Sequence, residues 1–309
     1  MNKLVRVAGL GAVSWALRRW NTPAPHARGS ALQAQSATIV TAARRLNRAS
    51  GVIAGSVLID SAMEHYRGDF QNPAMWTPLA TAALTIGTSL HGLADRTHGA
   101  HMARDGIYAT AGAVGLAGTA FHVYNITKRP GGFSWQNLFY AAPLGAPAAI
   151  SLAGLVGFLA ERVRDNRPGT PELIFGLPAG RVVAAGTAVA LLATSSEAGL
   201  LHFRGAFHDP AMLLPVVLPP ISAAVLLRAA LSGASGGRIV TTILGGTAVM
   251  GILGVAFHAY GVSRNNGGFR NWRQTLFAGP PLPAPPAFTG LALAGLAALG
   301  LMRSARLAR

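Results

Sequence analysis

The sequence contains no cysteine and few charged residues. Without cysteine, the chain has no disulfide, no thiolate metal site, no iron–sulfur ligands and no cysteine nucleophile. Charged residues make up 12% of the chain, about half of the ~25% that is usual in soluble domains. Among the charged residues, the acidic ones are the fewer, with 10 Asp and Glu against 26 Lys and Arg. This composition argues against a soluble globular domain.

Hydrophobic residues, at 51% of the chain, are arranged in long blocks. The blocks are about 20 residues long, which is the length that crosses ~30 Å of hydrocarbon. The 38 glycines fit this class, because small residues let membrane helices approach one another closely. The sequence therefore predicts an all-α integral membrane protein. Eight transmembrane helices are expected, at 47–66, 74–93, 103–125, 141–160, 181–203, 211–230, 238–260 and 281–302.

A tandem repeat divides the chain into two halves of four predicted helices. The recurring residues are mostly polar, aromatic, Gly or Pro, and the second copy follows the first after 136 to 138 residues. The clearest matches are HYRG at 65–68 with HFRG at 202–205, FHVY at 121–124 with FHAY at 257–260, and GGF at 131–133 with GGF at 267–269. An even number of helices gives both halves the same orientation, so we expect a pseudo-two-fold axis along the membrane normal.

The repeat sets the predicted organisation of the chain. Four-helix repeats at 47–160 and 181–302 are joined by a cytoplasmic connection at 161–180, and a short basic tail follows at 303–309. Residues 1–46 form a basic tail without acidic residues, which could contain an interfacial helix. This composition also fits an organelle transit peptide. We expect a bacterial inner-membrane protein, with an organelle membrane as the alternative.

The basic residues predict the orientation of the chain. Of the 26 Lys and Arg, 19 lie at the helix ends on the side of both termini and seven lie at the opposite ends. By the positive-inside rule, both termini are cytoplasmic. Trp76, Trp135 and Trp272 fall at the opposite ends, where an aromatic belt is expected. The charge follows helix ends and no reading motif accompanies it, so membrane lipids, and no nucleic acid, are the expected partners.

The repeated ionisable and aromatic residues gather toward the periplasmic end of the predicted helices. Ionisable residues inside a bilayer cost several kcal/mol unless they are paired, so they indicate a functional site. In each half the candidates are a carboxylate, two His, an Arg and a Tyr: Asp60, His65, His122, Arg67 and Tyr124, repeated as Glu197, His202, His258, Arg204 and Tyr260.

Several interpretations of these residues stay open. The pairs His65–His122 and His202–His258 suit the axial ligation of b-type haem, with Arg67 and Arg204 on the propionates. Each pair could instead form a metal site with the carboxylate of its half. The carboxylate and the first His are five residues apart on one α-helix, however, which places them on different faces of that helix. A third interpretation is that these residues only hydrogen-bond helix ends and loops.

The function predicted from these features is electron transfer by a membrane subunit rather than a stand-alone enzyme. Haem near the periplasmic face would serve a periplasmic dehydrogenase or another periplasmic redox protein, with quinone as the acceptor. The alternatives are a transporter or channel with Asp60 and Glu197 on its path, and a non-catalytic membrane anchor.

The predicted topology can be tested by cysteine labelling. The wild-type chain has no cysteine, so the single variants Pro130→Cys and Asn266→Cys have no background. We expect a membrane-impermeant maleimide to label both variants from the periplasmic side, because the positive-inside rule places these loops outside. Labelling that reaches either residue only from the cytoplasm would reverse the orientation.

Overall fold

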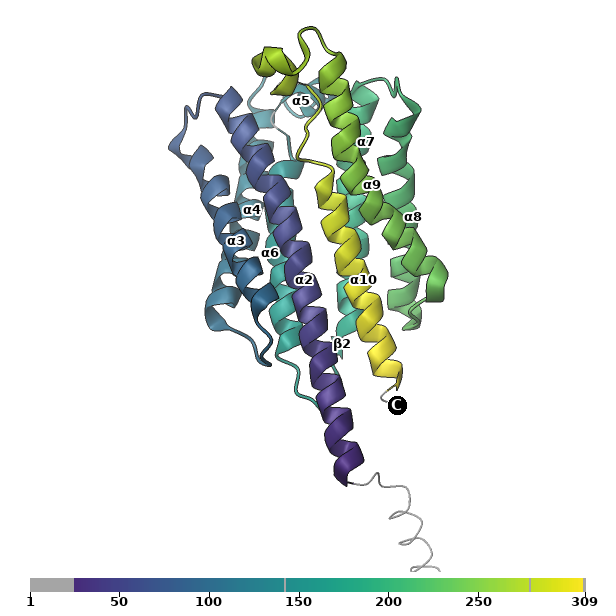
Figure 1. The fold of residues 1–309 in the computed structure, drawn as a ribbon. Coiled ribbons are helices and arrows are strands. Elements are labelled where there is room, and N and C mark those ends of the chain that lie inside the picture. Colours follow the sequence, from purple (N-terminus) through teal and green to yellow (C-terminus); the bar gives the residue numbers. More distant parts are fainter. Residues whose placement is uncertain (1–24, 142, 278, 308–309) are drawn as a thin grey trace, which may run out of the picture.

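The fold is a bundle of long helices that run side by side along one axis (Figure 1). The computed structural model describes residues 25–141, 143–277 and 279–307. Within these ranges eight helices have 18 or more residues: α2 (Pro25–Arg67), α3 (Thr77–Ala94), α4 (Met102–Thr127), α6 (Gly145–Arg164), α7 (Ala179–Arg204), α8 (Leu214–Ser232), α9 (Gly237–Arg264) and α10 (Pro286–Leu307).

Short elements occupy the connections at the two ends of the bundle. One end, which we call the upper end as in Figure 1, carries η1 (Pro73–Trp76), α5 (Trp135–Tyr140), η2 (Pro210–Leu213), η3 (Gly268–Asn271) and η4 (Trp272–Leu276). At the lower end, β1 (Leu173–Ile174) pairs with β2 (Leu177–Pro178) in an antiparallel hairpin. The start of α2 and the end of α10 also lie at the lower end.

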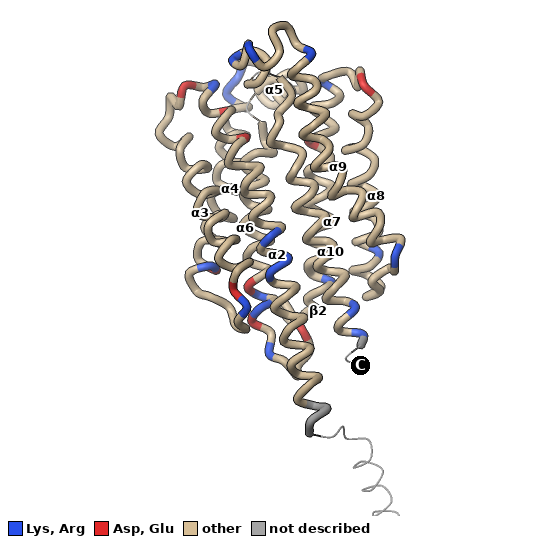
Figure 2. Tube along the Cα trace, viewed as in Figure 1, with Lys and Arg blue, Asp and Glu red and all other residues tan. Residues whose placement is uncertain are grey.

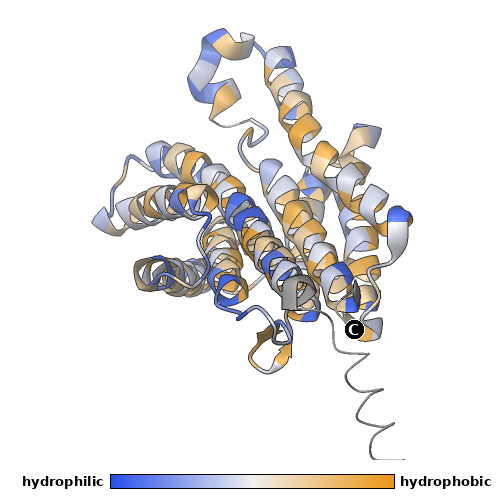
Figure 3. Ribbon diagram, turned by 60° about the horizontal axis from the view of Figure 1, so that its bottom comes forward, coloured by the Kyte–Doolittle hydropathy of each residue, from blue (hydrophilic) through white to orange (hydrophobic). Residues whose placement is uncertain are grey.

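Within the described ranges, five helical segments are long and apolar enough to cross a membrane: Gly145–Arg164, Ala179–Arg204, Pro210–Ser232, Gly237–Arg264 and Pro286–Arg306. Large apolar side chains such as Val249, Ile252 and Leu253 are exposed on α9, and hydrophobic residues are frequent along the second-half helices (Figure 3). Charged residues concentrate toward the two ends (Figure 2). The chain is thus consistent with an all-α membrane protein.

The predicted N-terminal boundary at residue 47 was wrong. Helix α2 begins at Pro25, so residues 25–46 continue the first helix instead of forming a tail. Ile39, Ala43 and Leu46 recur at helical spacing and are fully buried in the core. The many Arg residues of this segment had suggested a surface tail, but one helix face supplies enough apolar contacts to dock it. The expected interfacial helix before residue 25 lies outside the described residues.

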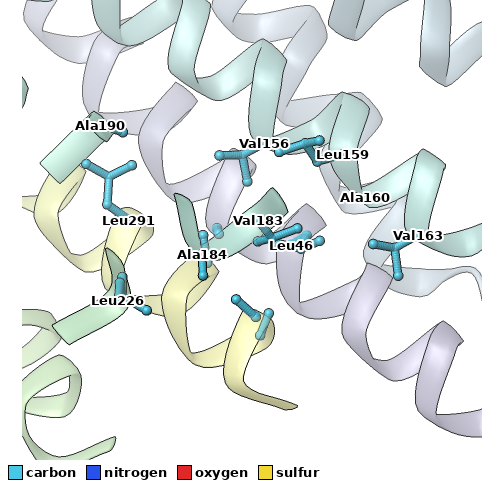
Figure 4. Packing of buried hydrophobic residues seen from close by; sticks show 14 of the residues in the cluster. Leu46, Val156, Leu159, Ala160, Val163, Val183, Ala184, Ala190, Leu226 and Leu291 are labelled. Atoms are coloured by element: carbon cyan, nitrogen blue, oxygen red, sulfur yellow. The ribbon is translucent and has the colours of Figure 1, made fainter. Parts of the chain in front are cut away.

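The long helices form two four-helix rings that pack against each other. In the first half α2, α3, α4 and α6 contact one another in a ring, and α7, α8, α9 and α10 do so in the second half. Contacts of α2 with α10, and of α6 with α7, join the two rings. The central helices are the most buried. In the most apolar 18-residue stretch of α10, 67% of the residues are buried, whereas the corresponding stretches of Pro210–Ser232 and of α9 are 22% buried. Leu46 and Val183 lie side by side in this central core, and Leu291 belongs to the same buried cluster (Figure 4).

Small residues allow the helices to pack closely where lipid offers no hydrophobic driving force. A Cβ atom on Gly290 of α10 would lie 2.9 Å from the Ala49 carbonyl oxygen of α2. A Cβ atom on Gly154 of α6 would lie 2.5 Å from the Tyr108 carbonyl oxygen of α4. Larger side chains at these glycines would therefore separate the helix pairs.

Aromatic side chains join the two halves at the upper end. Tyr66, at the end of α2, stacks on Phe277 of the second half with ring centroids 5.2 Å apart. Phe203, at the equivalent place in α7, stacks on Phe139 of the first half at 5.9 Å. Each half therefore places one ring of its first helix on the upper loop of the other half.

The lower ends of the two halves differ in chemistry. In the first half, Arg104 of α4 forms ion pairs with Asp95 at 2.8 Å and with Glu161 of α6 at 3.0 Å. Burial raises the pKa of Asp95, but hydrogen bonds from Thr97 and Arg104 outweigh it and hold the pKa below its usual range. Arg164 donates to the carbonyl of Gly92 at 2.8 Å and to that of Thr97 at 2.9 Å, which ties the α3–α4 connection to α6.

Apolar residues replace this network in the second half. The repeat offsets align Arg104, Glu161 and Arg164 with Val240, Leu299 and Met302, all of which are buried. The first half therefore depends on a buried charge network at a position where the second half has an ordinary apolar core.

We expect Glu161→Gln to lower the free energy of unfolding by about 3–5 kcal/mol, because two buried guanidinium groups lose a carboxylate partner. Thermal and denaturant unfolding in detergent measure this. Glu64→Gln is the matched control, since Glu64 pairs with Arg67 at the surface and exposed pairs contribute roughly 0–1 kcal/mol. Equal effects of the two substitutions would contradict a structural role for the buried network.

Candidate functional site

The first repeated motif forms a tight connection from α2 to α3. The backbone turns at Asp69 and Phe70, which have positive φ angles of 52° and 48°. The N–H of Phe70 donates to the carbonyl of His65 at 3.1 Å, and the Phe70 ring packs edge-on against the imidazole at 6.2 Å. Gly68 leaves room for Met75, whose Cε would lie 3.1 Å from a Cβ at that position.

The same connection occurs from α7 to α8. Ala206 and Phe207 have φ angles of 57° and 46°, and the N–H of Phe207 donates to the carbonyl of His202 at 3.1 Å. Asp209 caps η2 through a bond from the N–H of Ala211 at 2.8 Å, as Asn72 caps η1 in the first half. The repeated Gly, Asn or Asp, Pro and Met residues therefore have structural roles in both turns.

His65 and His202 each bind a backbone carbonyl through Nδ1. The distances are 2.6 Å from His65 Nδ1 to the oxygen of Met75 and 2.7 Å from His202 Nδ1 to that of Met212. In a 3₁₀ turn the donor to these carbonyls would be the residue three positions later. Both of those residues, 78 and 215, are proline and have no N–H. The imidazole therefore supplies the missing donor.

His122 and His258 do the same for the carbonyls ahead of α6 and α10. His122 Nδ1 lies 2.6 Å from the oxygen of Pro143, and His258 Nδ1 lies 2.7 Å from that of Pro281. The residues four positions after these carbonyls, 147 and 285, are again proline and cannot donate. The N–H of Ala284 also reaches the Pro281 carbonyl, at 3.3 Å.

These contacts determine the tautomer of all four imidazoles. A carbonyl oxygen only accepts, so Nδ1 carries the proton and Nε2 of a neutral ring keeps its lone pair. Among the described residues, none hydrogen-bonds to Nε2 of these four rings. The centroids of the His202 and His258 rings lie 6.5 Å apart, with the ring planes at 70°. His65 and His122 are near enough for their charges to interact.

The helices that carry each pair stand diagonally in their ring. In the first half α2 and α4 each contact α3 and α6, and in the second half α7 and α9 each contact α8 and α10. The two His of a pair thus approach each other across the interior of a four-helix ring. Within the described ranges, no three His, Asp or Glu side chains come together as a metal-binding group.

The two repeated carboxylates lie where the halves meet. The Glu197 carboxylate of α7 lies against Gly145, at the first turn of α6 in the other half. A Cβ atom on Gly145 would lie 2.5 Å from one carboxylate oxygen, so a larger residue here would displace the end of this side chain. Asp60 and Glu197 are close enough for their charges to interact.

The repeated Arg and Tyr side chains point to other partners. Arg67 pairs with Glu64 at 2.7 Å, and Arg204 donates to the Phe139 carbonyl at 3.0 Å. Tyr124 is 53% exposed and Tyr260 is 57% exposed, so both lie on the outer surface of the bundle rather than beside the His pairs.

A second polar group lies outside the repeated residues. A groove of about 770 Å³ between α3 and α4 is lined near the lower end by His91, His101 and Arg104. Arg104 Nη1 lies 3.2 Å from His91 Nδ1. The sequence indicates this group through a difference between the two repeats. Arg104 and Glu161, which are buried, align with the apolar residues Val240 and Leu299 of the other half.

Comparisons with protein-family models, with curated proteins and with solved structures found no match to this chain. The fold defines its class, an all-α bundle consistent with a membrane protein. A functional proposal therefore depends on the chemistry of the His pairs and the carboxylates.

The structural role of the imidazoles predicts how His202 substitutions affect stability. His202→Ala leaves the Met212 carbonyl without its donor and should lower the free energy of unfolding by about 1–3 kcal/mol. His202→Asn should recover most of this loss, because the Asn amide nitrogen takes the place of Nδ1. Thermal unfolding in detergent compares the variants. Equal loss in both would mean that the hydrogen bond has no stabilising role.

Proposed function

We propose that the protein is an integral membrane subunit for electron transfer that binds b-type haem within each four-helix half. In this proposal all eight long helices cross the membrane and both termini are cytoplasmic. The two halves are tandem repeats related by a pseudo-two-fold axis along the membrane normal. His65 with His122, and His202 with His258, are the axial ligands, near the periplasmic face.

The observation that carries the proposal is the state of the four imidazoles. Each has Nδ1 bound to a carbonyl and Nε2 without a hydrogen-bond partner among the described residues, which is the arrangement that orients a ligating His and raises its basicity. Two imidazoles on one iron have ring centroids roughly 6 Å apart, at about 2 Å per iron–nitrogen bond. The 6.5 Å between His202 and His258 matches this value.

The residues around each pair would hold the ligands in place. Phe70 and Phe207 pack edge-on against His65 and His202, which limits rotation of those rings. Arg67 remains a predicted partner of a propionate, since its pair with Glu64 is exposed and such pairs are weak. When bound, haem supplies one-electron chemistry, and the chain supplies ligands, orientation and a dry interior.

The upper surface supports docking of an acidic periplasmic redox protein. Its loops carry seven basic residues: Arg67, Lys128, Arg129, Arg204, Arg264, Arg270 and Arg273 (Figure 2). Phe133 and Trp135 stand exposed among them. Aromatic and Arg side chains are enriched at protein interfaces, and opposite charge steers association. Quinone is the proposed electron acceptor.

Absorption spectroscopy of the purified protein tests the proposal. We expect a Soret band and sharp α-bands after reduction, with two haems per chain. His258→Asn keeps a donor for the Pro281 carbonyl but removes Nε2, so it should lose one haem and remain folded. His208→Ala is the control, because His208 is exposed and has no counterpart in the other half.

Two results would reject haem binding. One is wild-type protein, expressed with sufficient haem, that shows no absorption beyond the protein band. The other is a haem spectrum that His258→Asn and His65→Asn leave unchanged in intensity and position.

A further inference from the structure

The aromatic residues that join the two halves at the upper end form two sets of three rings. The open set is Trp135, Phe139 and Phe203, and the repeat aligns it with the closed set, which is Trp272, Phe277 and Tyr66. In the closed set all three rings contact one another, with centroids 5.2 to 6.3 Å apart. In the open set Phe139 contacts both other rings, at 6.0 and 5.9 Å, but Trp135 and Phe203 do not meet. The stacking across the halves is thus reciprocal, while the position of the Trp differs.

One additional residue accounts for this difference. The repeat offset is 137 from Trp135 to Trp272 and 138 from Phe139 to Phe277, so the second half has one more residue between these rings. It is accommodated in the π-helix η4, where the first half has the α-helix α5. An extra residue in a helical turn shifts the register of the side chains before and after it. Trp272 therefore lies against the other rings and is 41% exposed, whereas Trp135 is 72% exposed.

A groove of about 520 Å³ lies between α5 and α7 at the open set. It is lined by Trp135, Phe139, Ser196, Gly199, Leu200 and Phe203. The loop side of the groove is held by buried Asn137, whose amide donates to the carbonyls of Pro130 and Gly132 at 3.1 and 2.7 Å. The groove is therefore formed before a ligand arrives, which lowers the entropy cost of binding.

The groove presents aromatic faces with hydrogen-bond donors at its edge. All six lining residues are uncharged. The indole N–H of Trp135 has no hydrogen-bond partner among the described residues. Arg204 follows Phe203 and donates to the Phe139 carbonyl at 3.0 Å, which brings a guanidinium with further N–H groups to the same place. Aromatic faces favour a flat ring in offset stacking, and N–H donors favour carbonyl oxygens on that ring.

An apolar stripe on α7 leads away from the groove toward the middle of the bundle. One helix face carries, at intervals of three or four residues, Val189, Leu192, Ser196, Leu200 and Phe203. Val189 and Leu192 are 67% and 47% exposed. At 1.5 Å per residue, the stripe is roughly 21 Å long. A ligand with a hydrocarbon tail can therefore keep its ring in the groove and its tail along α7.

We infer that this groove binds a quinone, with its ring between Trp135 and Phe203. A quinone has the three features that the groove and the stripe select: a flat uncharged ring, carbonyl acceptors and an apolar tail. His202 directly precedes Phe203 on α7, so the quinone ring lies beside the helical turn that carries a candidate haem ligand. The role of this quinone as electron acceptor rests on the proposed function, whereas its binding does not require haem.

Photoaffinity labelling of the wild-type protein tests the site. The probe is a benzoquinone with an azido group on its ring and a decyl tail, activated by light in the presence of the protein in detergent. Mass spectrometry maps the labelled peptides, and unlabelled decylbenzoquinone competes with the probe. We expect label on α5 at Trp135 and on α7 from Ser196 to Phe203, with saturable displacement by the competitor. Decanol should not displace the label, because it has no ring to stack.

Phe203→Ala and Tyr66→Ala are the decisive pair of variants. Each removes one ring that stacks across the two halves, but of these two residues only Phe203 lines the groove. Phe203→Ala should raise the competitor concentration for half displacement by about tenfold, near the upper limit of one aromatic stacking contact. Tyr66→Ala should leave it unchanged. Ser196→Ile copies Ile59 of the other half and should also weaken binding, because the larger side chain fills the groove.

Two results would overturn the inference. Label that decylbenzoquinone does not displace would leave Trp135 as a residue of the aromatic belt, and equal effects of Phe203→Ala and Tyr66→Ala would place the quinone elsewhere. Failure here differs from failure of haem binding. A colourless protein with displaceable label in the groove rejects only haem, and a haem spectrum without displaceable label rejects only the quinone site.

Discussion

The upper end of the bundle depends on a hydrogen bond from a histidine Nδ1 to a backbone carbonyl. A proline stands at the position whose N–H would otherwise donate to that carbonyl. It occurs four times, at distances of 2.6 to 2.7 Å. Pro78, Pro147, Pro215 and Pro285 cannot donate a hydrogen bond near the starts of α3, α6, α8 and α10, and the imidazoles donate to carbonyls at these places. Because each bond joins one helix to the start of another, the four bonds also align the helices that carry the candidate site.

This arrangement accounts for both interpretations of the repeated histidines. A structural donor role occupies Nδ1, and a ligand role would occupy Nε2, so the two roles do not compete for the same atom. The hydrogen bond even improves the imidazole as a ligand, since it orients the ring. The recurrence of these residues in both halves therefore has a structural cause that holds whether or not a haem is bound.

The two halves are alike at the upper end and different elsewhere. Reciprocal stacking of Tyr66 on Phe277 and of Phe203 on Phe139 joins them symmetrically. At the lower end, buried Arg104 and Glu161 stand where the second half has apolar residues. Asymmetry of this kind gives two related sites different chemistry without a change of fold.

The sequence by itself determined the class of the protein, the number of long helices and their ends. Apolar blocks, glycine content and scarce charge are properties of composition and spacing, so seven of the eight helices begin within about five residues of their expected positions. The first boundary failed because docking of 25–46 depends on Ile39 and Leu46 finding a surface on other helices, which spacing cannot show. Only the tertiary structure decided what the repeated residues touch. The histidine hydrogen bonds join positions 10 to 23 residues apart, and the Glu197 carboxylate lies against Gly145 of the other half. Such contacts depend on helix packing, whereas the sequence pattern reports only which residues share a helix face.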